Sequence, residues 1–223
     1  MKGILLTKNK TLYKRISLSL GGVLLMGFGA ALSILSGQGT DPCTCLNLGV
    51  SGKIGLPFWL WQSIANTALL SLPLIFARRL IGFGTFANMF LCGIFADLFR
   101  SLYGALFRLP PSPAARAALM LCGTFIVGVG GALYTAPDFG LAPYDCVPFI
   151  LKERLHLDFR VCRICWDVLC VLGGWLLGSA VGAGTVLLAA GIGPLLHFLV
   201  PRIRRRFLTP GPVFAEKREL PRT

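Results

Sequence analysis

Long apolar stretches separated by short polar breaks dominate the 223-residue chain. Each stretch carries few or no charged side chains, and a run of about 18 or more such residues is the pattern of a membrane-spanning helix. The predicted spans are residues 20–36, 58–77, 85–106, 117–136, 161–180 and 185–200. The pattern therefore predicts an all-α, polytopic membrane helix bundle of about six transmembrane helices.

The composition agrees with a chain that lies almost wholly in a bilayer. Hydrophobic residues make up 55% of the chain and charged residues 14%, and the mean hydropathy is +0.73. Soluble domains are about 45–50% apolar and about 25% charged. We therefore expect a single membrane domain over 1–223. The first span opens after Lys14 and Arg15 and does not resemble a cleaved signal peptide.

The positive charges predict how the chain is oriented. The net charge is +13, with 22 Lys and Arg against 9 Asp and Glu. Six spans place 17 of these basic residues on one side and four on the other, with Arg163 inside a span. Because Lys and Arg accumulate in cytoplasmic segments, we expect a multi-pass protein of the bacterial inner membrane with both termini in the cytoplasm. The basic ends, 1–15 and 204–223, are expected to meet anionic lipid, and nucleic acid is not expected as a partner.

The chain also contains an internal repeat. The segment GFGAAL at 27–32 resembles GVGGAL at 128–133, and Gly39-Thr-Asp-Pro42 resembles Gly140-Leu-Ala-Pro143, both at a spacing of 101 residues. These matches predict two three-span repeats, 16–107 and 114–203. Three is an odd number, so the second repeat would enter the membrane in the opposite orientation, as in many transporters. A scaffold protein that arose by duplication would have the same pattern.

Each repeat contains a proline that is expected to start a short helix. Thr40 or Asp41 would be the N-cap of a helix that begins at Pro42 and ends near Gly49 or Gly52. The second helix would begin at Pro143, with Asp145 in its first turn, and reach about Arg154. Both helices are too short to span a bilayer. They are either re-entrant helices whose N-termini face a protein-lined cavity, or capped connectors at the membrane interface.

Polar side chains inside the spans are the candidate functional groups, because they are costly in hydrocarbon. Gln62 and Asn66 are four residues apart on the second span, and Arg163 and Asp167 occupy the equivalent positions on the fifth. The charged pair is either an internal salt bridge or part of a polar cavity. The candidate substrate-binding residues are Thr40, Asp41, Gln62, Asn66, Asn88, Asp97, Arg163 and Asp167.

No catalytic or metal site is expected. The cysteines form two groups, Cys43 with Cys45 and Cys162 with Cys165 and Cys170, which the topology places near opposite membrane faces. Four converging ligands would be needed for zinc, so the cysteines are expected to pack as small apolar residues. The sequence has no recognisable catalytic triad, zinc-protease motif or phosphate-binding loop. We expect no enzyme activity and no cofactor.

The first repeat resembles a known family. The runs GTDPCTCLNLGVSGKIGLPFWLWQSIANTALL and IGFGTFANMFLCGIFADLF are similar to the YczE/YyaS/YitT group of bacterial integral membrane proteins, most of all to its YczE branch. Cys43 and Cys45 depart from the pattern, where Trp and small polar residues are expected. The resemblance implies a cell-membrane protein of five or six spans without a defined activity.

The leading functional hypothesis is a small secondary transporter for a small polar or anionic solute, with its site between the repeats. A coupling ion and the lipid bilayer would be its partners, and a homo-oligomer is left open. The alternatives are a non-transporting membrane scaffold or accessory protein, and a channel. The predicted repeat favours transport because many transporters are built from inverted repeats, with the substrate site between them.

Overall fold

The computed structural model describes residues 2–106 and 112–208, and the side chains from residue 12 onward. All regular structure in these residues is helical. The elements are α1 (Lys2–Ser36), α2 (Pro42–Ile54), α3 (Phe58–Leu69), α4 (Ser71–Phe76), the 3-10 helix η1 (Arg78–Leu80), α5 (Phe83–Leu106), α6 (Pro113–Thr135), α7 (Pro143–Leu155), α8 (Phe159–Leu176) and α9 (Ala183–Phe207). The basic tail expected at 204–223 lies outside the described residues from 209 on.

Five helical segments are long and apolar enough to cross a membrane, in the described part of the chain. They are Leu12–Ser36, Phe58–Phe76, Phe83–Leu106, Pro113–Thr135 and Ala183–Phe207. The predicted fifth span, 161–180, corresponds to α8, which has 18 residues and is not among the five. Arg160, Arg163 and Asp167 lower its hydropathy. The all-helical membrane fold is confirmed, and a sixth span is not.

The second predicted span is one segment in the structure as well, but its helix is interrupted at a single residue. Leu70 lies between α3 and α4 and keeps a right-handed helical backbone (φ −60°, ψ −25°). Pro73 follows three residues later and has no backbone N–H to donate to the preceding turn, which weakens a helix at that point. The 12-residue helix α3 before this interruption carries Gln62 and Asn66 among its buried residues.

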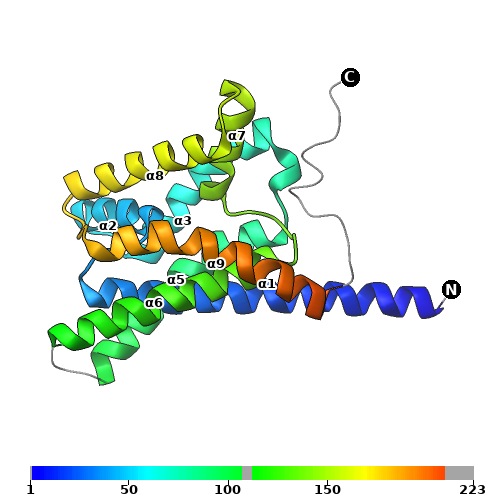
Figure 1. The fold of residues 1–223 in the computed structure, drawn as a ribbon, viewed down its shortest axis with the longest axis horizontal. Helices are drawn as coiled ribbons and strands as arrows, with labels where there is room; N and C mark the ends of the chain where they lie inside the picture. Colours follow the sequence, from blue (N-terminus) through cyan, green and yellow to red (C-terminus); the bar gives the residue numbers. More distant parts are fainter. Residues whose placement is uncertain (1, 107–111, 209–223) are drawn as a thin grey trace.

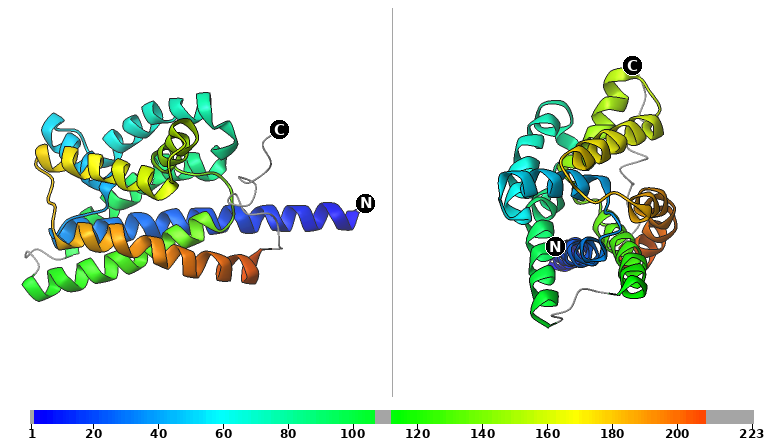
Figure 2. Two further views of the ribbon diagram at one scale, coloured as in Figure 1. Left: turned by 45° about the horizontal axis from the view of Figure 1, so that its top comes forward. Right: turned by 90° about the vertical axis from the view of Figure 1, so that its left-hand side faces the viewer.

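The helices form two layers. Figure 1 shows α1, α6 and α9 side by side along the long axis of the molecule, and α2 and α8 lie together above them. The view along this axis in Figure 2 separates the two groups clearly. Helix α5 packs against α1 and also against α3, and so connects the layers. The short helices of the upper layer carry most of the charged residues considered below.

Glycines hold α1 and α6 close together. A methyl group on Gly22 would lie 2.7 Å from the carbonyl oxygen of Gly130, and one on Gly29 would lie 2.8 Å from the carbonyl oxygen of Gly123. Only a residue without a side chain allows two helix backbones to approach this closely. The two contacts are related by the repeat, because Gly123 and Gly130 lie 101 residues after Gly22 and Gly29.

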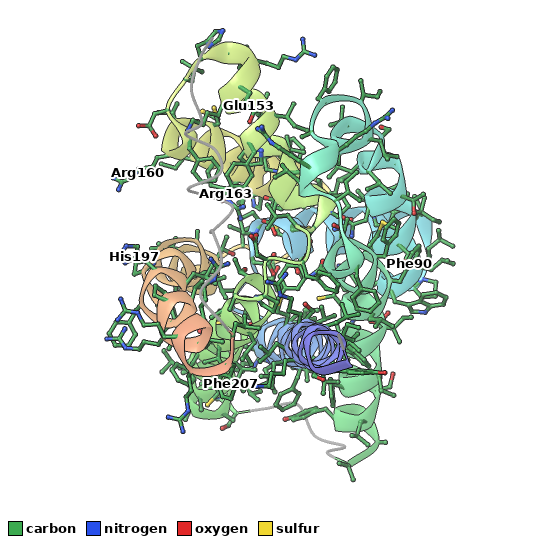
Figure 3. All side chains as sticks on the ribbon, turned by 90° about the vertical axis from the view of Figure 1, so that its right-hand side faces the viewer. Phe90, Glu153, Arg160, Arg163, His197 and Phe207 are labelled. Atoms are coloured by element: carbon green, nitrogen blue, oxygen red, sulfur yellow. The ribbon has the colours of Figure 1, made fainter. Side chains whose placement is uncertain are left out.

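The outer surfaces of the helices are strongly apolar. On α8 the exposed side chains include Ile164, Leu169 and Leu176, which are 62%, 63% and 74% exposed. Figure 3 shows Phe90 of α5 at the opposite edge of the molecule, where it is also exposed. Apolar surface of this extent is unfavourable in water and is expected where lipid covers it. Arg163 and Asp167 lie on the less exposed face of α8, at 35% and 18% exposure.

Candidate functional site

Helix α2 begins as its sequence predicts. Asp41 is the N-cap, with an extended backbone (φ −62°, ψ 157°), and its carboxylate accepts a 3.1 Å hydrogen bond from the backbone N–H of Thr44. Pro42 occupies the first turn. The helix continues past the expected ends, Gly49 and Gly52, to Ile54. It ends there because Gly55 adopts the left-handed conformation (φ 72°), which glycine accepts without strain.

Helix α7 is its counterpart in the second repeat. It begins at Pro143, carries Asp145 in its first turn, and ends at Leu155, one residue beyond the expected end. His156 closes it in the left-handed conformation (φ 54°), 101 residues after Gly55. The two short helices therefore have the same length, the same proline start and the same type of ending.

The N-termini of α2 and α7 meet near the middle of α8. Along α2, the Cys45 thiol contacts the carbonyl oxygen of Val171, and Gly49 lies against Gly174, so α2 runs parallel to α8. Along α7, the Tyr144 hydroxyl contacts Asp167, whereas the ring of Phe149 stacks on Phe159, so α7 runs antiparallel to α8. Both helices start near the level of Asp167 and extend toward opposite ends of α8.

A charged centre lies at this meeting point, and we define it as Asp41, Asp145, Arg163 and Asp167. Arg163 donates from Nη1 to Asp145 Oδ1 (2.8 Å) and from Nε to Asp167 Oδ2 (2.9 Å). The guanidinium also lies 5.4 Å from the centre of the Tyr144 ring. In Figure 3, Arg163 points toward the middle of the molecule, whereas Arg160 of the same helix lies at its periphery. The internal salt bridge predicted as one alternative is present, and Asp145 extends it to another helix.

The Tyr144 hydroxyl completes the hydrogen bonding of Asp167. It donates a 2.6 Å hydrogen bond to Asp167 Oδ1, the oxygen that Arg163 does not contact. The Tyr144 ring in turn packs against Trp166, with ring centres 5.6 Å apart. Asp145 and Tyr144 were not among the candidate residues from the sequence. Both residues follow Pro143 in the first turn of α7, and this position was the sequence signal that could have identified them as site residues.

Asp41 has no basic partner within hydrogen-bond distance in the described part of the chain. The charges of Asp167 and Arg163 nevertheless act on it, so the three groups lie close together. Burial raises the pKa of the Asp41 carboxyl above its ordinary value, and hydrogen bonds from the side chain and the backbone N–H of Thr44 oppose this effect in part. Asp41 is therefore the carboxylate of the charged centre whose negative charge is least compensated.

The candidate amide residues are buried around α3 and α5. Gln62, Asn66 and Asn88 are 7%, 5% and 5% exposed. The side chain of Gln62 lies beside the Cys92 thiol, and Cys92 in turn lies within electrostatic range of Asp41. Asn88 Nδ2 lies 3.9 Å from the sulfur of Met26. Thr40, next to Asp41, is 4% exposed, and its hydroxyl has no hydrogen-bond partner among the described residues.

Asp97 lies in a different place from the charged centre. Its carboxylate accepts a 2.9 Å hydrogen bond from the backbone N–H of Trp59, at the start of α3, and it pairs with Arg100 at 2.9 Å. With Ile94, Leu98 and Ser101 it lines an open groove of about 330 Å³. Its repeat counterpart His197 is exposed at the edge of the molecule (Figure 3). Asp97 acts here as a cap for α3.

The thiols do not form a metal site in the described part of the chain. None of the eight cysteines forms a disulfide, and no group of three or more His, Cys, Asp or Glu side chains is arranged to hold a metal ion there. Cys45, Cys146, Cys162 and Cys170 are buried. Cys45 and Cys146 are repeat counterparts, and each packs as a small side chain at a helix contact.

Comparison with known proteins gives relatives but no activity. A family model described as a family of unknown function (DUF6198) matches residues 13–201. An uncharacterized protein of Haemophilus influenzae is 30% identical over 86% of each chain. The uncharacterized protein YyaS of Bacillus subtilis is 29% identical, over 84% of this chain and 93% of its own. The uncharacterized membrane protein YczE of the same organism is 24% identical, over 81% and 83%. No solved structure matches.

Proposed function

Because the chain belongs to the family of unknown function DUF6198 and is related to the membrane protein YczE, we propose that it is a small secondary transporter. The transported molecule would be a small polar or charged solute. It would bind at the charged centre, between two inverted repeats. The observation that carries this proposal is the meeting of two short helices, one from each repeat, at the level of Asp167.

Reciprocal contacts support the inverted repeat. The N–H of Gly84 donates to the carbonyl oxygen of Phe139 at 2.7 Å, and the N–H of Gly184 donates to the carbonyl oxygen of Gln38 at 2.9 Å. Gln38 and Phe139 are 101 residues apart, and the two glycines are 100 residues apart. Each repeat thus places its connector on the third long helix of the other. A two-fold axis between the repeats generates this reciprocity, as at the interface of a symmetric dimer.

In the proposed arrangement α8 is also a membrane helix, the fifth along the chain, which makes six in total. Its most exposed side chains are apolar, and Arg163 and Asp167 of the charged centre lie on its less exposed face, at 35% and 18% exposure. Helix α2 then runs from the membrane interior toward the outer surface, and α7 runs toward the cytoplasm. Helix starts inside the membrane are acceptable only where protein or water satisfies the backbone, and transporters use such starts to bind solutes.

The first experiment is a binding screen. Purified protein in detergent would be heated with a panel of small polar metabolites, including cations, anions and zwitterions. A ligand of a 1:1 site raises the midpoint of unfolding because it binds only the folded state. We expect at least one hit in the wild type that is lost in Asp167→Asn.

The second experiment is a flux measurement with the hit in proteoliposomes, with Asp158→Asn as the matched control. Asp158 is exposed and caps α8 outside the charged centre, and asparagine can cap a helix as well as aspartate. Transport is supported if the wild type and Asp158→Asn move the solute and Asp167→Asn does not. A folded wild-type protein that binds no member of the panel and moves none would instead favour the scaffold.

A further inference from the structure

The charged centre has more negative than positive charge. Three carboxylates, from Asp41, Asp145 and Asp167, accompany the single guanidinium of Arg163, which leaves a formal charge of −2. The N-termini of α2 and α7 each contribute about half a positive charge. About one negative charge remains uncompensated, so one added positive charge would make the centre neutral.

The uncompensated negative charge lies on Asp41. Arg163 binds Asp145 and Asp167 with different nitrogens, and Tyr144 donates to Asp167. In the described part of the chain Asp41 accepts hydrogen bonds only from Thr44, from its backbone N–H and from its side chain. The titratable and charged groups that act on Asp41 are Cys43 and Cys45 of α2, Cys92 of α5, and Arg163 and Asp167 of α8. Tyr144 and Asp145 of α7 and Cys170 of α8 lie near Cys43, two residues from Asp41.

Two buried oxygen atoms without a partner among the described residues indicate what kind of group would bind. One is the hydroxyl of Thr40, next to Asp41 in the chain, and the other is Oε1 of Gln62. Gln62 is 7% exposed, and its Oε1 accepts no N–H or O–H from the described residues, although the Cys92 thiol lies beside it. Cys92 lies within electrostatic range of Asp41. A buried acceptor without a donor is unfavourable, so a ligand with N–H groups would be favoured over one that has only acceptors.

We infer that the charged centre holds one positive charge at a time, either a proton on Asp41 or a small organic cation that donates N–H groups. The inference rests on the proposed transport function and names its substrate class and its coupling ion. When the cation binds, Asp41 is ionised and its proton has left to water. When the proton returns to the carboxylate, the cation is released. One charge replaces one charge, so the exchange leaves the charge of the centre unchanged.

Infrared spectroscopy of the purified full chain in detergent tests the proton half. At about pH 6 exposed aspartates are ionised. We expect the wild type to keep a protonated carboxyl band at this pH. The band should be absent in Asp41→Asn, which retains a helix-capping side chain, and present in the exposed control Asp158→Asn. A wild type without the band, or a band that persists in Asp41→Asn, would overturn the inference.

The same sample tests the cation half with four probes at matched ionic strength. These are the chlorides of ammonium, methylammonium, ethylammonium and guanidinium. We expect at least one to remove the Asp41 band and to release one proton per bound cation, measured with a pH indicator. Tetramethylammonium, which has no N–H group, should leave the band unchanged. Displacement by none of the four, or equal displacement by tetramethylammonium, would show that the inferred ligand class is wrong.

A second variant separates the role of Gln62 from that of Asp41. Gln62→Leu removes the buried acceptor and leaves the carboxylate. We expect it to keep the infrared band and to need at least tenfold more of the active probe to remove it, since tenfold corresponds to about 1.4 kcal/mol of lost contact. If Gln62→Leu needs the same probe concentration as the wild type, Gln62 does not contact the bound cation. Two outcomes separate this inference from the proposed function. Proton displacement by a cation without solute flux in liposomes would contradict transport but not this inference. Solute flux restricted to anions would contradict this inference but not transport.

Discussion

The backbone N–H of Gly84 donates a 2.7 Å hydrogen bond to the carbonyl oxygen of Phe139, across the boundary between the two halves of the chain. The bond is possible because the neighbouring backbones lie in contact. A methyl group on Gly140 would lie 2.6 Å from the backbone nitrogen of Gly82 and 2.6 Å from the hydroxyl of Thr85. Gly140 also has a positive φ of 112°, as its counterpart Gly39 has at 107°.

Gly140→Ala should therefore be one of the most damaging single changes in the upper layer. Alanine at this position would meet backbone atoms and would also be strained at a positive φ. We expect a loss of about 2–4 kcal/mol, at the severe end of single substitutions, measured as thermal unfolding in detergent. Gly37→Asn is the control, because no atom lies within 4 Å of its Cβ and the counterpart of Gly37 is Asp138 with φ 56°. A tolerated Gly140→Ala would contradict the close contact.

The crossing of α1 and α6 allows a test with adjacent residues. Gly22 lies against Tyr134 and Gly130, whereas a methyl group on Gly21 would have no atom within 4 Å. Gly21→Ala should leave the unfolding midpoint unchanged or raise it, because alanine favours a helix by about 0.5–1 kcal/mol over glycine. Gly22→Ala should lower the midpoint. Equal effects at the two positions would show that the helices do not cross at Gly22.

Removal of the guanidinium from the charged centre should destabilise the fold more than removal of the whole pair. Arg163→Gln leaves Asp145 and Asp167 without their cation, and we expect a loss of about 1–3 kcal/mol, reduced from the cost of a fully buried pair because Arg163 is 35% exposed. The double variant Arg163→Gln with Asp167→Asn reproduces the Gln62 and Asn66 pair of α3. It should recover part of the lost stability without recovering binding, as unfolding and binding measurements on the same samples would show.

The raised pKa of Asp41 predicts how stability depends on pH. The folded protein binds the Asp41 proton more tightly than the unfolded chain does. This contribution to stability is complete below the ordinary pKa of aspartate, about 3.9, and is lost as the pH rises through the raised value. The unfolding midpoint of the wild type should thus fall over this range relative to that of Asp41→Asn. Parallel pH profiles for the two proteins would contradict the raised pKa.

The proposed topology can be measured with reporter fusions. Alkaline phosphatase is active only outside the cytoplasm, and green fluorescent protein fluoresces when it folds in the cytoplasm. We expect phosphatase activity for a fusion after Leu106, at the end of α5, and fluorescence for a fusion after Leu208. The opposite pattern would show that the protein has the reverse orientation. If both fusions report the same side of the membrane, the inverted relation between the repeats is contradicted.

The parts of the fold that depend on local sequence could be predicted. Asp41 and Pro42 determine a helix start without help from the rest of the chain, and the structure has the predicted N-cap. The interruption between α3 and α4 at Leu70 was not predicted, because hydropathy does not register the missing N–H of Pro73. The meeting of α2 and α7 was left open because it depends on contacts more than a hundred residues apart, such as that between Cys45 and Val171. Asp145 was missed as a partner of Arg163 because their contact joins α7 to α8 and depends on how these two helices pack, which the local sequence does not determine.

The exchanged connectors have a consequence for the separate halves. Gln38 belongs to the first half but bonds to Gly184 of the second, and Phe139 bonds back to Gly84. A half-chain alone would therefore have an unsatisfied connector and an uncovered glycine face, and a second copy inserted upside down would satisfy both. In the proposed inverted arrangement, covalent linkage of the two halves fixes the ratio and the opposed orientation of such a pair. Once fused, the halves are free to differ, and here one keeps the amides Gln62 and Asn66 while the other has the charges of Arg163 and Asp167.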